Sequence, residues 1–259
     1  MRSAALFFGL VRILAAADPT KVELSQQTDQ AFIQYIQATE ARLDKQLADG
    51  NFLWVDGASE RLRSVRSGQV LVQPWTGPGD VAVPDGLIHD WIGAVFIPNA
   101  TLEKTLALVE DYNRHKYVYQ PEVRDSKLLG RNGNDYQVFL RLLKKKVLTV
   151  ELNTYHTVHY VPLDSKRWYS RSYSTRIAEL DDGRELPPGE DHGFLWRLDS
   201  YWRFAERDGG VYVECEAISL TRSVPKGLGW LINPIIQSLP RESLANTLRG
   251  TRQALQAGR

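Results

Sequence analysis

The sequence is nearly free of cysteine, since Cys215 is the single cysteine among 259 residues. One thiol cannot close an intramolecular disulfide or complete a cysteine cage around a metal ion. An excess of charge is also missing, because 32 basic residues against 31 acidic ones leave a formal net charge of +1. This balance excludes the basic footprint that a nucleic-acid-binding protein presents, so no nucleic-acid partner is expected.

Catalytic and metal-binding motifs are missing as well. The sequence contains no Gly-x-Ser-x-Gly, no phosphate-binding loop and no His-Glu-x-x-His. His156 and His159 lie three residues apart on an expected strand, so their side chains point to opposite faces and do not form a metal pair. His89 is interpreted as a satisfied histidine of a strand, and Cys215, which has no nearby base, as a small core residue. No metal and no cofactor are expected.

Long apolar runs are confined to the N-terminus. Arg2 precedes the apolar stretch Ala4–Leu14 and then Ala15–Ala17, which is the layout of a secretory signal cleaved after Ala17. Arg12 interrupts the apolar stretch, so a retained amphipathic helix is the alternative. No other segment approaches the roughly 18 apolar residues that a membrane span needs. We therefore predict a signal peptide at 1–17 and a soluble protein of the periplasm or the exterior.

The remaining composition is that of a folded chain rich in β structure. Hydrophobic residues make up 43% and charged residues 24%, which is enough to bury a core. Seven Trp and eleven Tyr against one Met favour strands over a helical bundle. Proline and glycine nowhere form a long linker, so one compact body with an appendage is expected.

Residues 18–84 are predicted to be that appendage, an N-terminal helical accessory region. Apolar residues at helical spacing predict an amphipathic helix from Ser25 to Gly50, and a short basic helix follows over Ala58–Ser67. Turn residues dominate from Pro74 to Pro84. The arginines of the basic helix are interpreted as a solvated face, and the alternative is that this region docks a protein partner.

From residue 85 onward the apolar period changes from helical to alternating. The pattern predicts one strand, a helix over Ala100–Tyr112, six antiparallel strands and a long C-terminal helix that is punctuated by Pro234 and Pro240. The predicted strands are Leu87–Ile97, Val123–Arg131, Tyr136–Leu143, Leu148–Val161, Trp168–Leu180, Phe194–Glu206 and Val211–Thr221. The domain 85–259 is therefore assigned to the α+β class.

This order of elements resembles the helix-grip fold of the START, polyketide cyclase and birch-pollen-allergen superfamily. Residues 86–257 carry the resemblance, which is closest to uncharacterised exported bacterial members. The local sequences that carry it are Gly-Leu-Ile-His-Asp-Trp-Ile-Gly at 86–93, Tyr-Trp-Arg-Phe at 201–204, Cys-Glu-Ala-Ile-Ser-Leu-Thr-Arg at 215–222 and Gly-Leu-Gly-Trp-Leu at 227–231. The resemblance implies a curved seven-stranded sheet around the C-terminal helix, with a cavity for a lipid, quinone or polyketide-like molecule between them.

Strand alternation identifies the inner face of this sheet independently of the resemblance. A turn at Asp208-Gly209 or Gly209-Gly210 places even-numbered residues of one strand opposite odd-numbered residues of the next. The apolar face is predicted to collect Trp196, Leu198, Trp202, Phe204, Val213, Cys215 and Ala217, and Leu231 and Ile235 of the C-terminal helix should cover it. Small residues beside large aromatics leave room for a ligand, although a filled core gives the same alternation.

Arg176 is a further candidate on the preceding strand. If the alternation turns it inward beside Trp196, its guanidinium would anchor an anionic or carbonyl-bearing head group. The alternative is a solvated arginine, or one that pairs with Glu179 or Glu151.

Two interpretations of function follow. The favoured one is a non-catalytic carrier of a hydrophobic small molecule, and the alternative is a cyclase-like or hydrolytic enzyme that uses the same cavity. In the enzyme, Arg176 with Tyr173, His156 or Glu151 would act on a carbonyl. Lys144–Lys146 would allow a transient contact with a membrane surface, but such a run is also typical of a protected turn.

Overall fold

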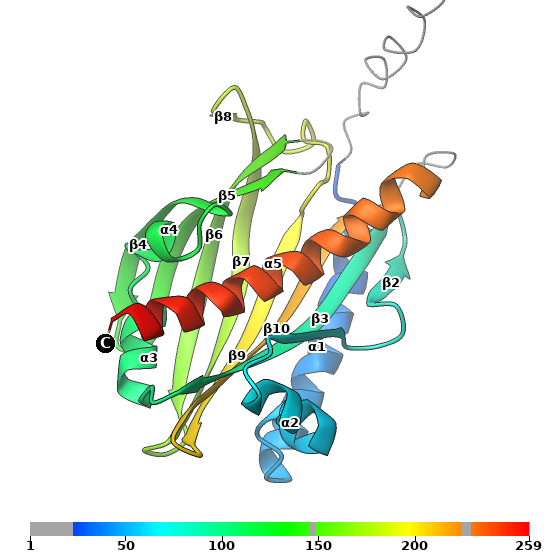
Figure 1. Ribbon diagram of the computed structural model, residues 1–259. Helices are drawn as coiled ribbons and strands as arrows, with labels where there is room; N and C mark the ends of the chain where they lie inside the picture. Colours follow the sequence, from blue (N-terminus) through cyan, green and yellow to red (C-terminus); the bar gives the residue numbers. More distant parts are fainter. Residues whose placement is uncertain (1–22, 146–148, 224–228, 259) are drawn as a thin grey trace, which may run out of the picture.

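The structure is a computed structural model that describes residues 23–145, 149–223 and 229–258 (Figure 1). The predicted signal peptide at 1–17 and Lys146 lie outside these residues, and the side chains of the C-terminal helix are described from Leu239 onward. Within the described part of the chain, no helix is long and apolar enough to cross a membrane.

One antiparallel sheet forms the centre of the molecule. Its main path runs in the order β1-β3-β10-β9-β7-β6-β5-β4, while β2 pairs with β3 and β8 with β7. The strands are β1 (Leu71–Pro74), β2 (Asp80–Val83), β3 (Gly86–Pro98), β4 (Val123–Asn132), β5 (Asp135–Lys145), β6 (Thr149–Pro162), β7 (Arg167–Asp181), β8 (Arg184–Glu185), β9 (Arg197–Arg207) and β10 (Gly210–Arg222).

The seven predicted strands correspond to β3, β4, β5, β6, β7, β9 and β10, which confirms the α+β helix-grip architecture. The strand count differs, because β1, β2 and β8 extend the sheet to ten strands. β1 and β2 pair with successive parts of the long strand β3, so part of the predicted accessory region belongs to the sheet. β8 has only two residues and was expected to be loop.

Helices cover both faces of this sheet. α1 (Gln26–Ala48) begins after the N-cap Ser25, and η1 (Trp54–Gly57) and α2 (Ser59–Arg66) follow it. α3 (Leu102–Val109) is shorter than predicted and is followed by the unexpected short α4 (His115–Val118). α5 (Gly229–Ala257) runs without a break through Pro234 and Pro240, which were expected to punctuate it.

The two faces have separate cores. In Figure 1, α5 crosses in front of the sheet and α1 lies behind it. On the α5 side, which we call the inner face, Leu244 and Leu248 pack with Phe204, Val213 and their neighbours. On the α1 side, the outer face, two further clusters form around α1, η1 and α2. The accessory region therefore covers the face of the sheet that α5 leaves uncovered.

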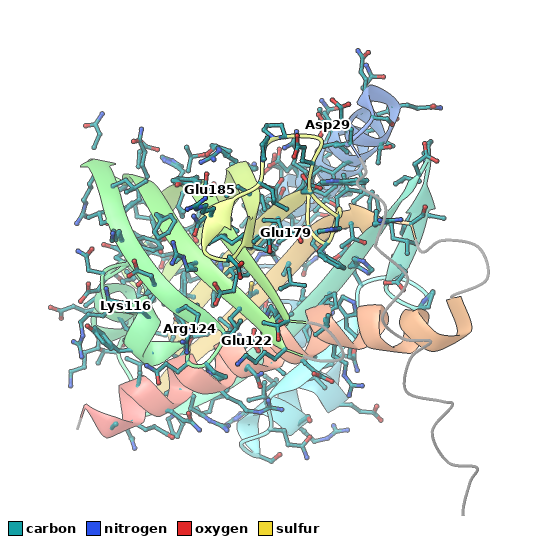
Figure 2. All side chains as sticks on the ribbon, turned by 90° about the horizontal axis from the view of Figure 1, so that it is seen from above. Asp29, Lys116, Glu122, Arg124, Glu179 and Glu185 are labelled. Carbon is teal, nitrogen blue, oxygen red and sulfur yellow. The ribbon has the colours of Figure 1, made fainter. Side chains whose placement is uncertain are left out.

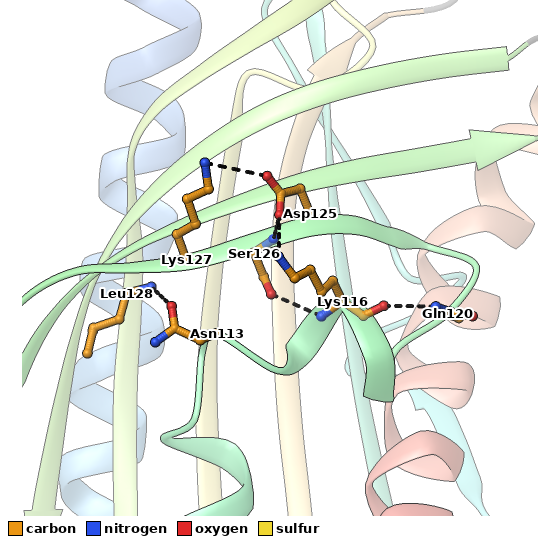
Figure 3. A network of polar contacts seen from close by, with 7 residues as sticks. All are labelled: Asn113, Lys116, Gln120, Asp125, Ser126, Lys127 and Leu128. Atoms are coloured by element: carbon orange, nitrogen blue, oxygen red, sulfur yellow. Dashed lines mark hydrogen bonds and ion pairs between the residues drawn. The ribbon is translucent and has the colours of Figure 1, made fainter.

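A polar network fixes α4 against β4 (Figure 3). The backbone N–H of Lys116 donates to Oγ of Ser126 at 2.9 Å, and Nζ of Lys116 donates to Asp125 at 2.9 Å. The backbone N–H of Leu128 donates to Oδ1 of Asn113 at 3.0 Å. These contacts hold the segment between α3 and β4 at the edge of the sheet.

The C-terminal half of α5 is tied to the same edge. Glu122 accepts from Nδ2 of Asn246 at 2.6 Å and pairs with Lys144, which also contacts Ser243. Figure 2 shows Glu122 beside α5. Lys144, the first residue of the predicted lysine run, thus serves a structural role. Burial alone would raise the pKa of Glu122, but the charge of Lys144 and the hydrogen bonds from Lys144 and Asn246 outweigh it and lower the pKa below its ordinary value.

Candidate functional site

The β9–β10 hairpin has the register that the turn sequence predicts. Trp202 lies opposite Cys215, Phe204 opposite Val213, and Ala217 opposite Ser200. All of these except Ser200 belong to the cluster that packs beneath α5. Leu198, opposite Ser219, follows the same alternation, so six of the predicted inner-face residues share one face.

Trp196 does not share that face. It precedes β9, which begins at Arg197, and it packs on the outer face with Phe32 and Ile36 of α1. Its backbone N–H donates to the carbonyl oxygen of Leu220 at 2.8 Å. The prediction for Trp196 is wrong because strand alternation ends where the strand ends.

Arg176 also lies on the outer face. The β6–β7 pairing matches Tyr155 with Arg176 but His156 with Ser174, so Thr175 is an extra residue that forms a β-bulge. The bulge reverses the alternation, and Ser170, Ser172 and Ser174 face inward while Arg176 does not. Its guanidinium pairs with Glu185 and lies 5.0 Å from the centre of the Tyr155 ring, and 52% of its side chain is exposed. Figure 2 shows Glu185 far from α5.

This placement corrects two predictions at once. Arg176 cannot anchor a head group on the inner face, and it lies on the opposite side of the sheet from His156, its suggested catalytic partner. Tyr173, another of the three suggested partners, donates to Glu40 of α1 on the outer face. Leu231 and Ile235 lie in α5, but their side chains are outside the described residues.

Burial on the inner face changes along the strands. At the end beneath Leu244 and Leu248, Phe204, Val211 and Val213 are fully buried. In the centre of the sheet, residues of the same face keep partial exposure, and they are Leu140, Ser172, Ser174, Leu198, Ser200, Trp202 and Ala217. The end beneath Leu244 and Leu248 is therefore a filled core, whereas the partly exposed residues form an apolar surface with hydroxyl groups that solvent or a ligand can reach.

His156 lies on the inner face beside this central part, opposite Val138 on β5 and Ser174 on β7. Its Nε2 lies 3.0 Å from Oγ1 of Thr154, and its buried Nδ1 has no hydrogen-bond partner among the residues that the structure describes. Burial lowers the pKa of His156 to about 4, so the ring is neutral at neutral pH. The sequence correctly predicted that the side chains of His156 and His159 point to opposite faces, but it gave no indication that one nitrogen of His156 would be buried without a partner among the described residues.

Cys215 and His89 have the roles that the sequence predicts. Cys215 is buried on the inner face, and burial raises the pKa of its thiol, so it is not a reactive thiolate. His89 is completely buried, and its ring nitrogens contact Asp80 at 2.6 Å and Thr221 at 3.0 Å. No three His, Cys, Asp or Glu side chains of the described residues are arranged to hold a metal ion.

The outer face holds a buried layer of charged residues that sequence analysis did not predict. Asp90, Arg203, Glu214 and Glu216 are each less than a tenth exposed, because α1 and η1 cover them. Glu214 accepts the backbone N–H groups of Trp54 and Val55 at 2.8 and 2.9 Å. Desolvation by burial raises the pKa of Glu214 to about 7. Strand alternation puts Arg203, Glu214 and Glu216 on the face opposite the predicted apolar residues, but it does not predict the helix that covers them.

One small hollow lies within this layer. Its volume is about 10 Å³, enough for one water molecule, and it is lined by Leu43, Ile92, Tyr201, Arg203, Glu214 and Glu216. A hollow of this size cannot hold an organic ligand. The charged layer is therefore a structural junction between sheet and accessory region, and the candidate ligand site is the inner face.

Similarity to known proteins is confined to the overall fold. No known family model matches the sequence, and no curated protein matches it. Solved structures do. A STAR-related lipid transfer protein from Xanthomonas axonopodis is 18% identical, with 72% of this chain and 98% of that chain covered and a TM-score of 0.48.

Two further structures are similar at lower sequence identity. A START superfamily protein from Mycobacterium smegmatis is 12% identical, covering 66% of this chain and 99% of that chain at a TM-score of 0.47. The Zhui aromatase/cyclase from Streptomyces is 9% identical, covering 65% and 94% at a TM-score of 0.45. These are the kinds of structure that the sequence resembles. At such values the similarity concerns the fold, and function is argued from the residues of this chain.

Proposed function

We propose that this protein binds a hydrophobic small molecule, such as a lipid, quinone or polyketide-like compound, on the inner face of its sheet beside α5. One observation carries the proposal: Leu198, Trp202 and Ala217 remain partly exposed on the same face whose other end is a filled core. A sheet face that existed only to pack against a helix would bury its aromatic residues along its whole length.

The distribution of ionisable groups favours binding over catalysis. A hydrolytic or cyclase-like enzyme needs titratable groups that converge on the ligand site. On the described inner face, His156 is neutral and hydrogen-bonded to a threonine rather than to a carboxylate, and the thiol of Cys215 is protonated. The dense cluster of Asp90, Glu214 and Glu216 lies on the other side of the sheet. The cyclase-like enzyme is retained as the second candidate on the strength of two inner-face histidines, His156 and His89, of which His89 lies opposite Ser219 and pairs with Asp80.

The predicted signal peptide would place this binding function in the periplasm or outside the cell. The support is the sequence Ala15–Ala17, a small-residue cleavage site after an apolar stretch. N-terminal sequencing of the protein from its native host should begin at or near Asp18. Mature protein that retains Met1 would remove the export part of this proposal and leave the binding part intact.

Native mass spectrometry of the full chain tests the binding function directly. Protein purified without detergent should carry an adduct of lipid size, and a neutral apolar dye such as N-phenyl-1-naphthylamine should bind to it and fluoresce. Mild organic extraction should remove the adduct and increase the dye signal. A protein that shows only the mass of the chain without an adduct and does not increase the dye's fluorescence would contradict the proposal.

A further inference from the structure

The hydrogen bonds around His156 determine which of its nitrogens carries the proton. Oγ1 of Thr154 donates its single hydrogen to the carbonyl oxygen of Leu140 at 3.1 Å. That oxygen can therefore only accept from Nε2 of His156, 3.0 Å away, so Nε2 carries the ring proton. Nδ1 is then an acceptor with a free lone pair, and within the described residues nothing donates to it.

An acceptor of this kind is costly in a protein interior, because burial removes the water that would otherwise donate to it. His156 is buried on a face whose neighbours Leu140, Ser172 and Ser174 are still partly exposed. The lone pair lies on the same face as the central surface assigned to the ligand, so a bound molecule whose hydroxyl displaces the side chains covering Nδ1 would supply the missing donor.

We propose that the ligand is an apolar molecule with a neutral hydroxyl group, an alcohol or a phenol, and that this hydroxyl donates to Nδ1 of His156. The inference rests on the proposed binding function and adds the chemical class of the head group. Ser172 and Ser200 are cross-strand partners on the same face, and their partly exposed hydroxyls can accept from or donate to the same group.

The charges of the inner face argue against an ionic head group. Lys144 is paired with Glu122, and Arg131 at the rim is paired with Glu110 at 3.5 Å. Neither cation is available to a carboxylate or phosphate ligand, and a carboxylate would place its negative charge against the lone pair of Nδ1. A purely hydrocarbon ligand would leave the lone pair unpaired. A neutral donor is the chemistry that satisfies it.

A matched series of ligands tests the inference. The compounds 4-octylphenol, 4-octylanisole and 4-octylbenzoate share one apolar body and differ in the head group. The phenol has a hydrogen-bond donor, the anisole has a methyl ether without a donor, and the benzoate has an anionic carboxylate. Each is titrated against protein loaded with N-phenyl-1-naphthylamine. The phenol should displace the dye with an affinity roughly tenfold higher than the anisole, the scale of one hydrogen bond to a buried partner, and the benzoate should bind more weakly than the phenol.

Two variants assign the effect to His156. His156→Leu removes the acceptor and should make phenol and anisole equal competitors, whereas His156→Asn places an amide oxygen near the position of Nδ1 and should restore part of the preference. Equal affinity of phenol and anisole for the wild type would overturn the inference, as would a preference that survives in His156→Leu. If His156→Leu does not fold, the wild-type series and His156→Asn still decide.

Failure of the binding function looks different from failure of this inference. If the wild type does not bind the dye at all, the proposed function fails and the head-group question does not arise. If all three compounds displace the dye equally, the protein binds apolar molecules and the role of His156 alone is refuted.

Discussion

The carboxyl groups of Asp90 on β3 and Glu216 on β10 meet in a buried site between the sheet and α1. Tyr35 of α1 donates to Oδ2 of Asp90 at 2.7 Å, and Arg42 of the same helix pairs with Glu216. The guanidinium of Arg42 also lies 3.8 Å from the centre of the Trp75 ring. Two carboxylates and one cation leave an excess of negative charge, so this site prefers to hold a proton.

This site makes stability depend on pH. Burial, and then the neighbouring charge of Glu216, raise the pKa of Asp90 to about 8 from its ordinary value of 3.8. Between these values the folded protein binds a proton that the unfolded chain has lost. The free energy of unfolding therefore falls as pH rises through this range and levels off above it.

Asp90→Asn should flatten that dependence, because the amide has no proton to lose. The slopes of wild type and variant should differ by at most about 1.4 kcal/mol per pH unit, the value for one proton. Urea unfolding followed by tryptophan fluorescence from about pH 5 to about pH 8 measures both slopes. Asp49→Asn, at the exposed end of α1, is the control, and its free energy of unfolding should change with pH at the same slope as that of the wild type. Parallel lines for Asp90→Asn would show that Asp90 does not hold the proton.

Glu214 should be essential to the attachment of η1. Glu214→Ala leaves the N–H groups of Trp54 and Val55 without an acceptor and removes a buried negative charge that stabilises the guanidinium of Arg203. We expect a loss of about 3–5 kcal/mol, the range for breaking a buried charged network. Glu214→Gln keeps one acceptor oxygen and should cost less. Equal losses for the two variants in chemical denaturation would mean that the contacts to η1 are unimportant.

Arg176→Ala should leave ligand binding unchanged. The arginine is half exposed on the outer face and paired with Glu185, so its removal should change stability by no more than about 1 kcal/mol, as for other exposed pairs. Dye titration and thermal melting of the variant check both statements. A clear loss of dye affinity would restore Arg176 as a head-group anchor and would require β7 to have no bulge.

Gly93 sets the distance between α5 and β3. A Cβ at this position would lie 2.7 Å from Cδ1 of Leu248 and 3.0 Å from the carbonyl oxygen of Leu71. Gly93→Ala should therefore cost about 1–3 kcal/mol by overpacking. Gly130→Ala on β4 is the matched control, because there the nearest atom is the flexible Oε1 of Gln137 at 3.4 Å. Equal melting temperatures for the two variants would indicate that α5 packs less closely than described.

Sequence reasoning succeeded where geometry is local. The turn at Asp208-Gly209 fixes the β9–β10 register, and that register carried Trp202, Phe204, Val213, Cys215 and Ala217 to one face. It failed for Arg176 because a single extra residue, Thr175, reverses the alternation, and no turn signal announces a bulge in the middle of a strand.

The remaining differences come from tertiary packing. The alternation of β10 gave the face of Glu214 and Glu216, but only the position of α1 makes that face buried. Tyr35 and Arg42 of α1 could have indicated this contact, because polar residues on the buried side of a helix need hydrogen-bond or charge partners across the interface. The lone pair of His156 could not be predicted, because it depends on how Thr154 and Leu140 bond across two strands.

The most direct test of binding on the inner face is a pair of alanine-to-tryptophan variants. Ala217 is partly exposed on the central inner face, whereas Ala205, one strand away, is buried in the packed outer core. Ala217→Trp should keep or raise the melting temperature and abolish dye binding, because the indole fills the ligand's space. Ala205→Trp should lose at least about 1–3 kcal/mol through overpacking yet still bind the dye while folded. A destabilised Ala217→Trp, made from a wild type that never bound the dye, would show that the inner face is an ordinary filled core and contradict the account.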